Sequence, residues 1–195
     1  EHWDELSQNE ERFWIPLIAL YSGMRQNEIC QLYCADIIKA DGVWCIDVNQ
    51  KTKDKKLKSA AAERTVPIHP RLIDLGFLKY MTKVKDAGEK RLWPNLKLEN
   101  GNYARAISRW FAGFCDEYIV DDPKKVFHSF RHNFTDTLKQ NGVQEVAIAE
   151  MVGHENASIT SSRYGKPLRP KPLLEVLKKL DYGLDLSGLK QDQKA

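Results

Sequence analysis

The sequence has no apolar run long enough to cross a bilayer, and its first ten residues, EHWDELSQNE, have none of the features of a signal peptide. Internal repeats and low-complexity segments are also missing, which excludes repeat architectures. Nor does the chain begin with methionine, so we expect a piece of a longer protein. These absences predict a cytoplasmic protein that makes no contact with a membrane.

Cysteine is scarce, and no pair of Cys or His residues follows the spacing of a zinc site. Cys30 and Cys34 are spaced to share a helix face, while Cys45 and Cys115 stand alone. Their mostly apolar neighbours favour buried thiols in a reducing compartment. Strand-borne carboxylates of a two-metal nuclease are missing too, since residues 121–123, Asp-Asp-Pro, have the form of a turn or cap. We therefore expect no metal ion and no cofactor.

Neither sign of charge dominates, because 30 Lys and Arg residues stand against 27 Asp and Glu residues, for a net charge of +3. That balance does not by itself indicate a nucleic-acid partner. The basic residues gather locally, in KTKDKKLK at 51–58 and in the segment 121–132, which contains DDPKK and FRH. An apolar content of 42% and a length of 195 residues suit one globular domain with a real core.

Apolar residues recur at helical spacing along most of the chain. The stretch 10–22 predicts a buried helix closed by Gly23, and 25–37 continues the helical pattern. The later helical segments are 70–84, 102–118, 128–142, 143–153 and 170–180.

Two short segments interrupt this helical pattern. Residues 42–48, GVWCIDV, and 63–69, ERTVPIH, are rich in β-branched residues. They predict an antiparallel hairpin with a long, exposed, lysine-bearing loop, in which Pro67 suits an edge strand. The expected fold class is α+β, mostly α, with a small antiparallel β-sheet.

Arg25 occupies a position that suits an anion better than a purely structural role. It follows a helix-ending glycine in SGMRQNE, at the start of the next helix, where a positive side chain opposes the helix dipole. Guanidinium groups and helix N-termini both attract phosphate. Glu28, three residues later, either orients the guanidinium or completes a helix cap.

In FHSFRH, His128 and Arg131 are three residues apart, so they share one face of a helix. Phe127, Phe130 and Phe134 form the adjacent apolar face, which we expect to lock the helix against the core. The His/Arg pair then projects from a rigid element. The alternative is a boundary helix with two incidental polar residues, because this spacing is common.

The segment GHENASITSSRYGK, residues 153–166, places His154 at a turn after a helix-ending glycine, and Tyr164 among small and hydroxylated residues. A tyrosine packed against a neighbour is the ordinary interpretation. A nucleophile that must reach a phosphate would also need such a setting.

Two arginines, two histidines, a loop lysine and a tyrosine together suffice for metal-free transfer of a phosphodiester. The arginines can pair with the non-bridging oxygens and stabilise the charge that develops on them. A lysine can protonate the leaving alkoxide. A tyrosine hydroxyl, with a reference pKa of about 10, can attack once cations or a base assist it.

The order of these motifs resembles the tyrosine recombinase, or phage integrase, family. SGMRQNEICQL is similar to its first arginine box, HSFRH to its H-x-x-R box, and MVGHENASITSSRY to the box that ends in the nucleophilic tyrosine. KTK followed by ERTVPIH resembles the hairpin that carries its lysine. The likeness runs from about residue 10 to about residue 180.

The resemblance implies a role for each residue. Arg25 and Arg131 would clamp the scissile phosphate, His154 would donate to it, and His128 would assist as a base or as a hydrogen-bond partner of the nucleophile. Tyr164 would attack to form a 3′-phosphotyrosyl link.

Lys51 would be the general acid for the 5′-hydroxyl leaving group. The segment from Thr52 to Arg64 is longer and richer in lysine than in compact members of the family, so Lys53 is an alternative.

The resemblance also implies double-stranded DNA attachment sites as partners, and a homotetramer acting on two duplexes through a Holliday junction. The isolated domain could be a monomer. Residues 1–182 would be the catalytic domain and 183–195 a tail, with the N-terminal core-binding domain absent. The helix at 170–180 would dock onto a neighbouring protomer, or pack on its own domain.

Two other functions remain open at this point. Residues 143–164 also resemble a helix-turn-helix, with Ala149 and Gly153 at suitable spacing, which would make the chain a DNA-binding module without chemistry. A tyrosine-type topoisomerase would use the same chemistry as a monomer.

Overall fold

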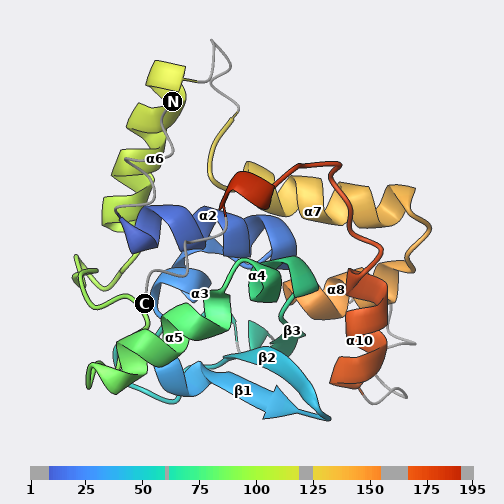
Figure 1. Cartoon of the computed structure of the whole chain (residues 1–195), viewed down its shortest axis with the longest axis horizontal. Coiled ribbons are helices and arrows are strands. Elements are labelled where there is room, and N and C mark those ends of the chain that lie inside the picture. Colours follow the sequence, from blue (N-terminus) through green and yellow to red (C-terminus); the bar gives the residue numbers. More distant parts are fainter. Residues whose placement is uncertain (1–8, 60–61, 119–124, 155–166, 190–195) are drawn as a thin grey trace.

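The computed structural model describes residues 9–59, 62–118, 125–154 and 167–189 (Figure 1). Helices are the main secondary structure of this part of the chain, and one small sheet lies on one side of it. The predicted fold class, α+β and mostly α, is confirmed. None of the described helices is long and apolar enough to span a bilayer.

Helix α2, Glu10–Ser22, begins and ends as the sequence predicts. The Asn9 side chain accepts a hydrogen bond from the backbone N–H of Arg12, and Gly23 ends the helix in the left-handed region at φ 62°. The helix buries Trp14 completely and packs along α7, Ser129–Gln140 (Figure 1). It is the central helix of the core.

Helix α3, Gln26–Cys30, is much shorter than the helical pattern through residue 37 predicts. Its last carbonyls accept hydrogen bonds from side chains of a distant segment. Trp93 Nε1 donates to Ile29 O at 2.7 Å, and Arg91 Nη2 donates to Cys30 O at 2.8 Å. After this point the chain makes a 3-10 turn, η1, Cys34–Asp36, and enters a strand. Cys30 and Cys34 therefore do not share a helix.

The sheet has three antiparallel strands in the order β1-β2-β3, one more than predicted. These are β1, Ile37–Ala40, β2, Val43–Val48, and β3, Arg64–Pro67. The sequence did not predict strand β1, because its residues continue the helical apolar pattern. The segment is a strand because it pairs with β2, with Ile37 opposite Ile46. Pro67 lies on an edge strand, as predicted.

The remaining helices surround α2 and the sheet. The segment predicted as one helix over 70–84 is two, α4, Pro70–Asp74, and α5, Phe77–Asp86, because Gly76 between them has φ 98°. Trp14, Phe77, Trp93 and Phe134 are the largest side chains of one continuous core. Three other helices follow: α6, Arg105–Tyr118, α8, Glu145–Val152, and α10, Pro170–Leu177.

Helix α10 packs on its own chain. Leu173 and Leu177 are buried against the sheet, where α10 contacts β3 and β2. The following residues are tied down as well, because Tyr182 Oη donates to Leu20 O at 2.8 Å and Asn141 Nδ2 donates to Lys179 O at 2.7 Å. Of the two placements that the sequence left open for this helix, the structure has the one on its own domain.

All four cysteines are free and buried, as the apolar neighbours predict. Burial raises the pKa of each thiol above its ordinary value, to about 11 for Cys45. Such thiols are poor nucleophiles and poor metal ligands at neutral pH.

Candidate functional site

Arg131 joins the ends of two helices. Its Nη1 donates to Gly23 O, at the end of α2, at 2.7 Å, and its Nη2 donates to Val152 O, at the end of α8, at 2.6 Å. Helix C-termini carry partial negative charge, so they suit a guanidinium. The Arg131 side chain is only 3% exposed. The prediction that Arg131 projects from the helix is therefore wrong, because its side chain is held inside the fold, although its charge still acts on His128.

Arg25 lies at the N-cap position of α3 and is held by Glu28. Its Nη1 donates to Glu28 Oε1 at 2.8 Å, and its backbone N–H donates to Glu28 Oε2 at 3.0 Å. Glu28 thus both orients the guanidinium and caps the helix, two roles that the sequence offered as alternatives. Burial opposes the charge of Glu28, but the nearby arginines outweigh it and lower the pKa of its carboxyl.

Arg64, the first residue of β3, is a third arginine at this place, and the sequence did not indicate it. Its Nη2 donates to Glu28 Oε2 at 2.8 Å and its Nε donates to Met151 O at 2.7 Å. A charged residue at the start of a short strand usually faces solvent, so the sequence carries little signal for such a role. Gly153, at φ 66°, makes room for it, since a Cβ there would lie 2.8 Å from Arg64 Nη1.

His128 and His154 complete the cluster. Burial lowers the pKa of His154, and the positive charges of Arg131, Arg25, Arg64 and His128 lower it further. The pKa of His128 is lowered in the same way, by burial and then by positive neighbours that include Arg131 and Arg25. Both imidazoles are thus predominantly neutral at pH 7, so each has one N–H donor and one acceptor nitrogen.

The structure therefore brings four of the predicted site residues together, Arg25, His128, Arg131 and His154. Burial and the positive charge of Arg25 lower the pKa of Arg131 to about 10, which still leaves it protonated at neutral pH. Among the described residues, no group of three or more His, Cys, Asp or Glu side chains is arranged to hold a metal ion. A cluster of guanidinium and imidazole donors over one buried carboxylate suits a phosphate diester.

Lys51 is not held in this cluster. Its side chain is 75% exposed, and Nζ lies 2.7 Å from Asp47 Oδ2, which raises the pKa of the ammonium. Its backbone N–H donates to Asn49 Oδ1 at 3.1 Å. Lys53 is exposed as well, and the charge of Lys58, in the same segment, acts on His128.

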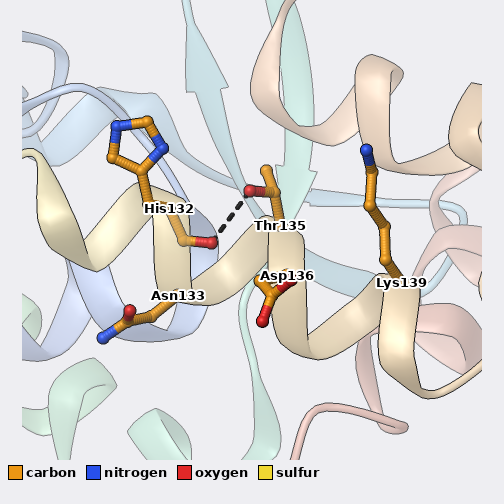
Figure 2. A pocket seen from close by; sticks show the side chains of 5 residues that line it. All are labelled: His132, Asn133, Thr135, Asp136 and Lys139. Carbon is orange, nitrogen blue, oxygen red and sulfur yellow. Dashed lines mark hydrogen bonds between the residues drawn. The ribbon is translucent and has the colours of Figure 1, made fainter.

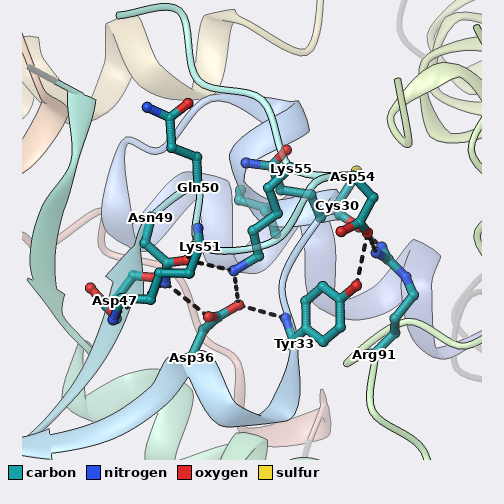
Figure 3. A network of polar contacts seen from close by, with 12 residues as sticks. Cys30, Tyr33, Asp36, Asp47, Asn49, Gln50, Lys51, Asp54, Lys55 and Arg91 are labelled. Carbon is teal, nitrogen blue, oxygen red and sulfur yellow. Dashed lines mark hydrogen bonds and ion pairs between the residues drawn. The ribbon is translucent and has the colours of Figure 1, made fainter. Parts of the chain in front are cut away.

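The segment between β2 and β3 was predicted to be an exposed loop, and this is wrong at its centre (Figure 3). Lys55 is buried, with Nζ 2.6 Å from Asp36 Oδ2 and 3.0 Å from Asn49 Oδ1. Asn49 in turn accepts from the Lys51 backbone, so the buried Lys55 holds the turn that carries Lys51. A buried ammonium needs such partners, which a lysine-rich sequence alone does not reveal.

The residue before Lys55, Asp54, fixes the loop to the body of the domain (Figure 3). Its Oδ2 accepts from the hydroxyls of Tyr33 and Tyr103, each at 2.8 Å, and from Arg91 Nη1 at 3.2 Å. Arg91 also stacks on the Tyr103 ring, with Cζ 3.5 Å from its centroid. Burial opposes the charge of Asp54, but hydrogen bonds from Thr52, Tyr103 and Tyr33 outweigh this effect and lower the pKa of the carboxyl to about 2.

Tyr164 lies in the segment 155–166, outside the described residues. The polar second helix of the helix-turn-helix alternative falls there too.

A hollow of about 430 Å³ lies elsewhere, on the outer face of α7 (Figure 2). It is lined by one helix and contains none of the predicted site residues; its lining is His132, Asn133, Thr135, Asp136 and Lys139. The Thr135 hydroxyl is turned back to the His132 carbonyl at 2.9 Å. We assign it no role.

Comparison with known proteins agrees with the motifs in the sequence. The model of the phage integrase family matches residues 7–169. Proteins named tyrosine recombinase are similar to the chain: that of Thermosipho africanus is 27% identical over 142 residues, and that of Pseudothermotoga lettingae is 25% identical over 160 residues. These alignments cover 72% and 80% of this chain but 44% and 50% of the relatives. The chain thus spans about half the length of the curated relatives it matches.

Two solved structures of the Tn1549 transposon integrase also resemble the chain. The complex with circular intermediate DNA aligns with a TM-score of 0.51 at 18% identity, over 90% of this chain and 63% of that one. The complex with transposon right end DNA aligns with a TM-score of 0.49 at 19% identity, over 80% and 55%. The first of these likenesses shows a shared fold.

Proposed function

Because the chain belongs to the phage integrase family, we propose that it cleaves and rejoins DNA strands in site-specific recombination, through a covalent 3′-phosphotyrosyl intermediate at Tyr164. One observation carries the proposal. Residues as distant in sequence as Arg25 and His154 meet around the ends of α2 and α8, with Arg131 bonded to both ends. That arrangement supports a phosphate-binding site built by the fold rather than a chance grouping of basic residues.

Arg25 and Arg131 clamp the scissile phosphate in this mechanism. Each guanidinium keeps N–H groups beyond those that the protein oxygens occupy, and these can donate to the non-bridging oxygens, where negative charge grows as the tyrosine attacks. Both are already oriented by protein oxygens, so little reorganisation is needed when DNA binds. His154 adds a neutral N–H donor to the same phosphate.

The Tyr164 oxygen forms a bond to phosphorus as the bond to the 5′-oxygen breaks. The tyrosine proton passes to His128, whose lowered pKa leaves it free to accept at neutral pH, or to water. The bond energy is kept in the phosphotyrosyl link, so the reverse attack by a 5′-hydroxyl rejoins a strand without ATP.

Lys51 donates the proton that the departing 5′-oxygen needs. To do so its ammonium must leave Asp47 and reach the phosphate, and an exposed ion pair of this kind opposes the movement only weakly. The buried Lys55 and Asn49 hold the backbone of the turn during that movement. Lys53 is the alternative donor.

The proposed partner is double-stranded DNA, with four protomers acting on two duplexes. The match covers only about half of each relative, so the domain is expected to bind DNA more weakly than the full-length proteins do. Residues 1–182 form the catalytic domain in this proposal.

The test is a covalent adduct on labelled duplexes that cover the ends of the genetic element encoding the chain. A nick near the cleavage point lets a short piece diffuse away, so a cleaved strand cannot be rejoined. We expect a denaturant-resistant protein–DNA adduct with the wild type and none with Tyr164→Phe. DNA binding by both proteins, with an adduct from neither, would instead support a binding module. Relaxation of supercoiled DNA without strand exchange would support a topoisomerase.

A further inference from the structure

Arg64 has no role in the mechanism above, yet its guanidinium contacts three parts of the site. Its side chain is 7% exposed and leaves β3 at the strand's first residue. Besides its bonds to Glu28 and to Met151 O, its Nη1 donates to Ala62 O at 2.8 Å. All three of its nitrogens thus donate to protein oxygens, so Arg64 connects parts of the protein to one another.

The contact with Glu28 links Arg64 to the first phosphate-binding arginine. Glu28 Oε1 accepts from the Arg25 guanidinium, while Oε2 accepts from Arg64 Nη2 and from the Arg25 backbone. The carboxylate is 3% exposed, so it stays charged only while its cationic partners remain in place. The position of the Arg25 guanidinium therefore depends on a carboxylate that Arg64 fixes from the other side.

The contact with α8 links Arg64 to the histidine. Met151 O and Val152 O are adjacent carbonyls at the end of that helix; Arg64 takes the first and Arg131 the second. Gly153 and His154 follow directly, and the His154 backbone N–H is bonded to Ala149 O. Arg64 thus holds the turn from which the His154 imidazole extends.

We propose that Arg64 is a positioning residue for DNA cleavage, which acts on Arg25 through the Glu28 carboxylate and on His154 through the Met151 carbonyl. The inference rests on the proposed function. An arginine is required because its planar fork reaches a carboxylate in α3 and a carbonyl in α8 at once, whereas the single nitrogen of lysine cannot take up this geometry.

The variant that tests this is Arg64→Lys, which keeps the charge and loses the fork. The single-turnover rate of adduct formation should fall roughly 10- to 100-fold, because small displacements of catalytic groups have effects of this size. Affinity for DNA should stay at the wild-type value. Tyr80→Phe is the matched control, since it also removes a buried hydrogen bond, to Leu92 O, but in a part of the core away from the site.

A double-mutant cycle keeps the test valid if Arg64→Lys folds poorly. Arg64→Met together with Glu28→Gln removes both members of the buried Arg64–Glu28 ion pair, and only Arg25, whose side chain is 24% exposed, loses its carboxylate partner. If Arg64 acts through Glu28, the two losses in rate will not add. Additive losses would contradict that route.

The charge of Arg64 has a separate readout that needs no DNA. Within the described residues, the charged and titratable groups that act on His154 are Arg131 and His128 from the α7 end, Arg25 from α3 and Arg64 from β3. Neutral Arg64→Gln should raise the pKa of His154 in an NMR titration, whereas Arg64→Lys should leave it close to the wild-type value. A His154 pKa that does not change in Arg64→Gln would show that Arg64 is not near the imidazole.

The outcomes separate the two proposals. If the wild type forms the adduct and Arg64→Lys forms it more slowly, the result supports both the proposed function and the positioning role of Arg64. Wild-type adduct with an equally fast Arg64→Lys overturns the positioning role and leaves the proposed function intact. No wild-type adduct on any duplex rejects the proposed function, and the role of Arg64 in cleavage with it.

Discussion

At the scale of single residues, the site is a group of cations arranged around one buried carboxylate. Glu28 neutralises part of the charge of Arg25 and Arg64, which lets three arginines share a small volume. The sequence predicted Arg25 and Arg131, because a helix-ending glycine and an H-x-x-R spacing mark them. It did not predict Arg64, whose partners in the site, Glu28 and Met151, lie 36 and 87 residues away along the chain.

The identity of the general acid is testable at one atom of the DNA. Lys51→Ala should cleave ordinary DNA roughly 10²- to 10⁴-fold more slowly than the wild type, since proton donation to the leaving oxygen is lost. A duplex with sulfur in place of the scissile 5′-oxygen has a leaving group that needs no proton, so it should restore the variant's rate. Lys53→Ala is the matched control and should cleave both duplexes at the wild-type rate; the reverse pattern would move the role to Lys53.

At the scale of elements, helix ends decide where the site forms. Gly23 and Gly153 end α2 and α8 in the left-handed region. Arg131 donates to the carbonyl of Gly23, and the two carbonyls before Gly153 accept from Arg64 and Arg131. The sequence predicts such glycine stops well, because they are local signals. It did not predict the early end of α3, because the side chains that bond the last helix carbonyls, Trp93 to Ile29 O and Arg91 to Cys30 O, come from far along the chain.

Gly23→Ala should destabilise the protein strongly. The residue has φ 62°, and an added Cβ would lie 2.5 Å from Phe134 Cδ1, so backbone strain and overpacking act together. We expect a loss of about 2–4 kcal/mol in free energy of unfolding, measured with urea. Gly113→Ala, inside α6 with no neighbour within 4 Å of the added Cβ, should instead gain about 0.5–1 kcal/mol. Equal effects at both positions would contradict this account.

His69, at the N-cap of α4, makes stability depend on pH. Its Nδ1 accepts from the Arg71 backbone at 3.1 Å, and burial lowers the pKa of its imidazole to about 4. The unfolded chain takes up this proton near pH 6.5 and the folded chain does not, so stability is full above that pH. As pH falls toward 4, up to about 3 kcal/mol should be lost.

The non-titrating His69→Asn, which can still cap the helix, supplies the control for this loss. Urea unfolding at pH 7 and pH 5 should show a smaller loss for the variant than for the wild type. An equal loss in both proteins would assign the pH dependence to other groups.

At the scale of the whole molecule, α10 and the residues after it close the domain on itself. The sequence predicted an amphipathic helix here but left its partner open, because an apolar face does not state which surface covers it. In this structure the partner is the sheet of the same chain, against which Leu177 is fully buried. The fold class, in contrast, was predictable from the sequence, because helical periodicity and β-branched segments are local signals that do not depend on which surfaces pack together.

Leu177→Ala should therefore destabilise a monomer, by about 2–5 kcal/mol in free energy of unfolding. The exposed Glu175→Ala on the same helix should change it by less than about 0.5 kcal/mol. Both unfolding curves should be independent of protein concentration. A midpoint that rises with concentration would indicate that α10 docks on a neighbouring copy.

The central claim is that Tyr164 becomes covalently joined to DNA at the arginine cluster. The most direct measurement is to trap the adduct on a nicked duplex, digest it with protease and nuclease, and identify by mass spectrometry the peptide that retains a nucleotide. The account predicts a 3′-phosphate on Tyr164. A nucleotide on any other residue, or an intact adduct from Tyr164→Phe, would contradict it.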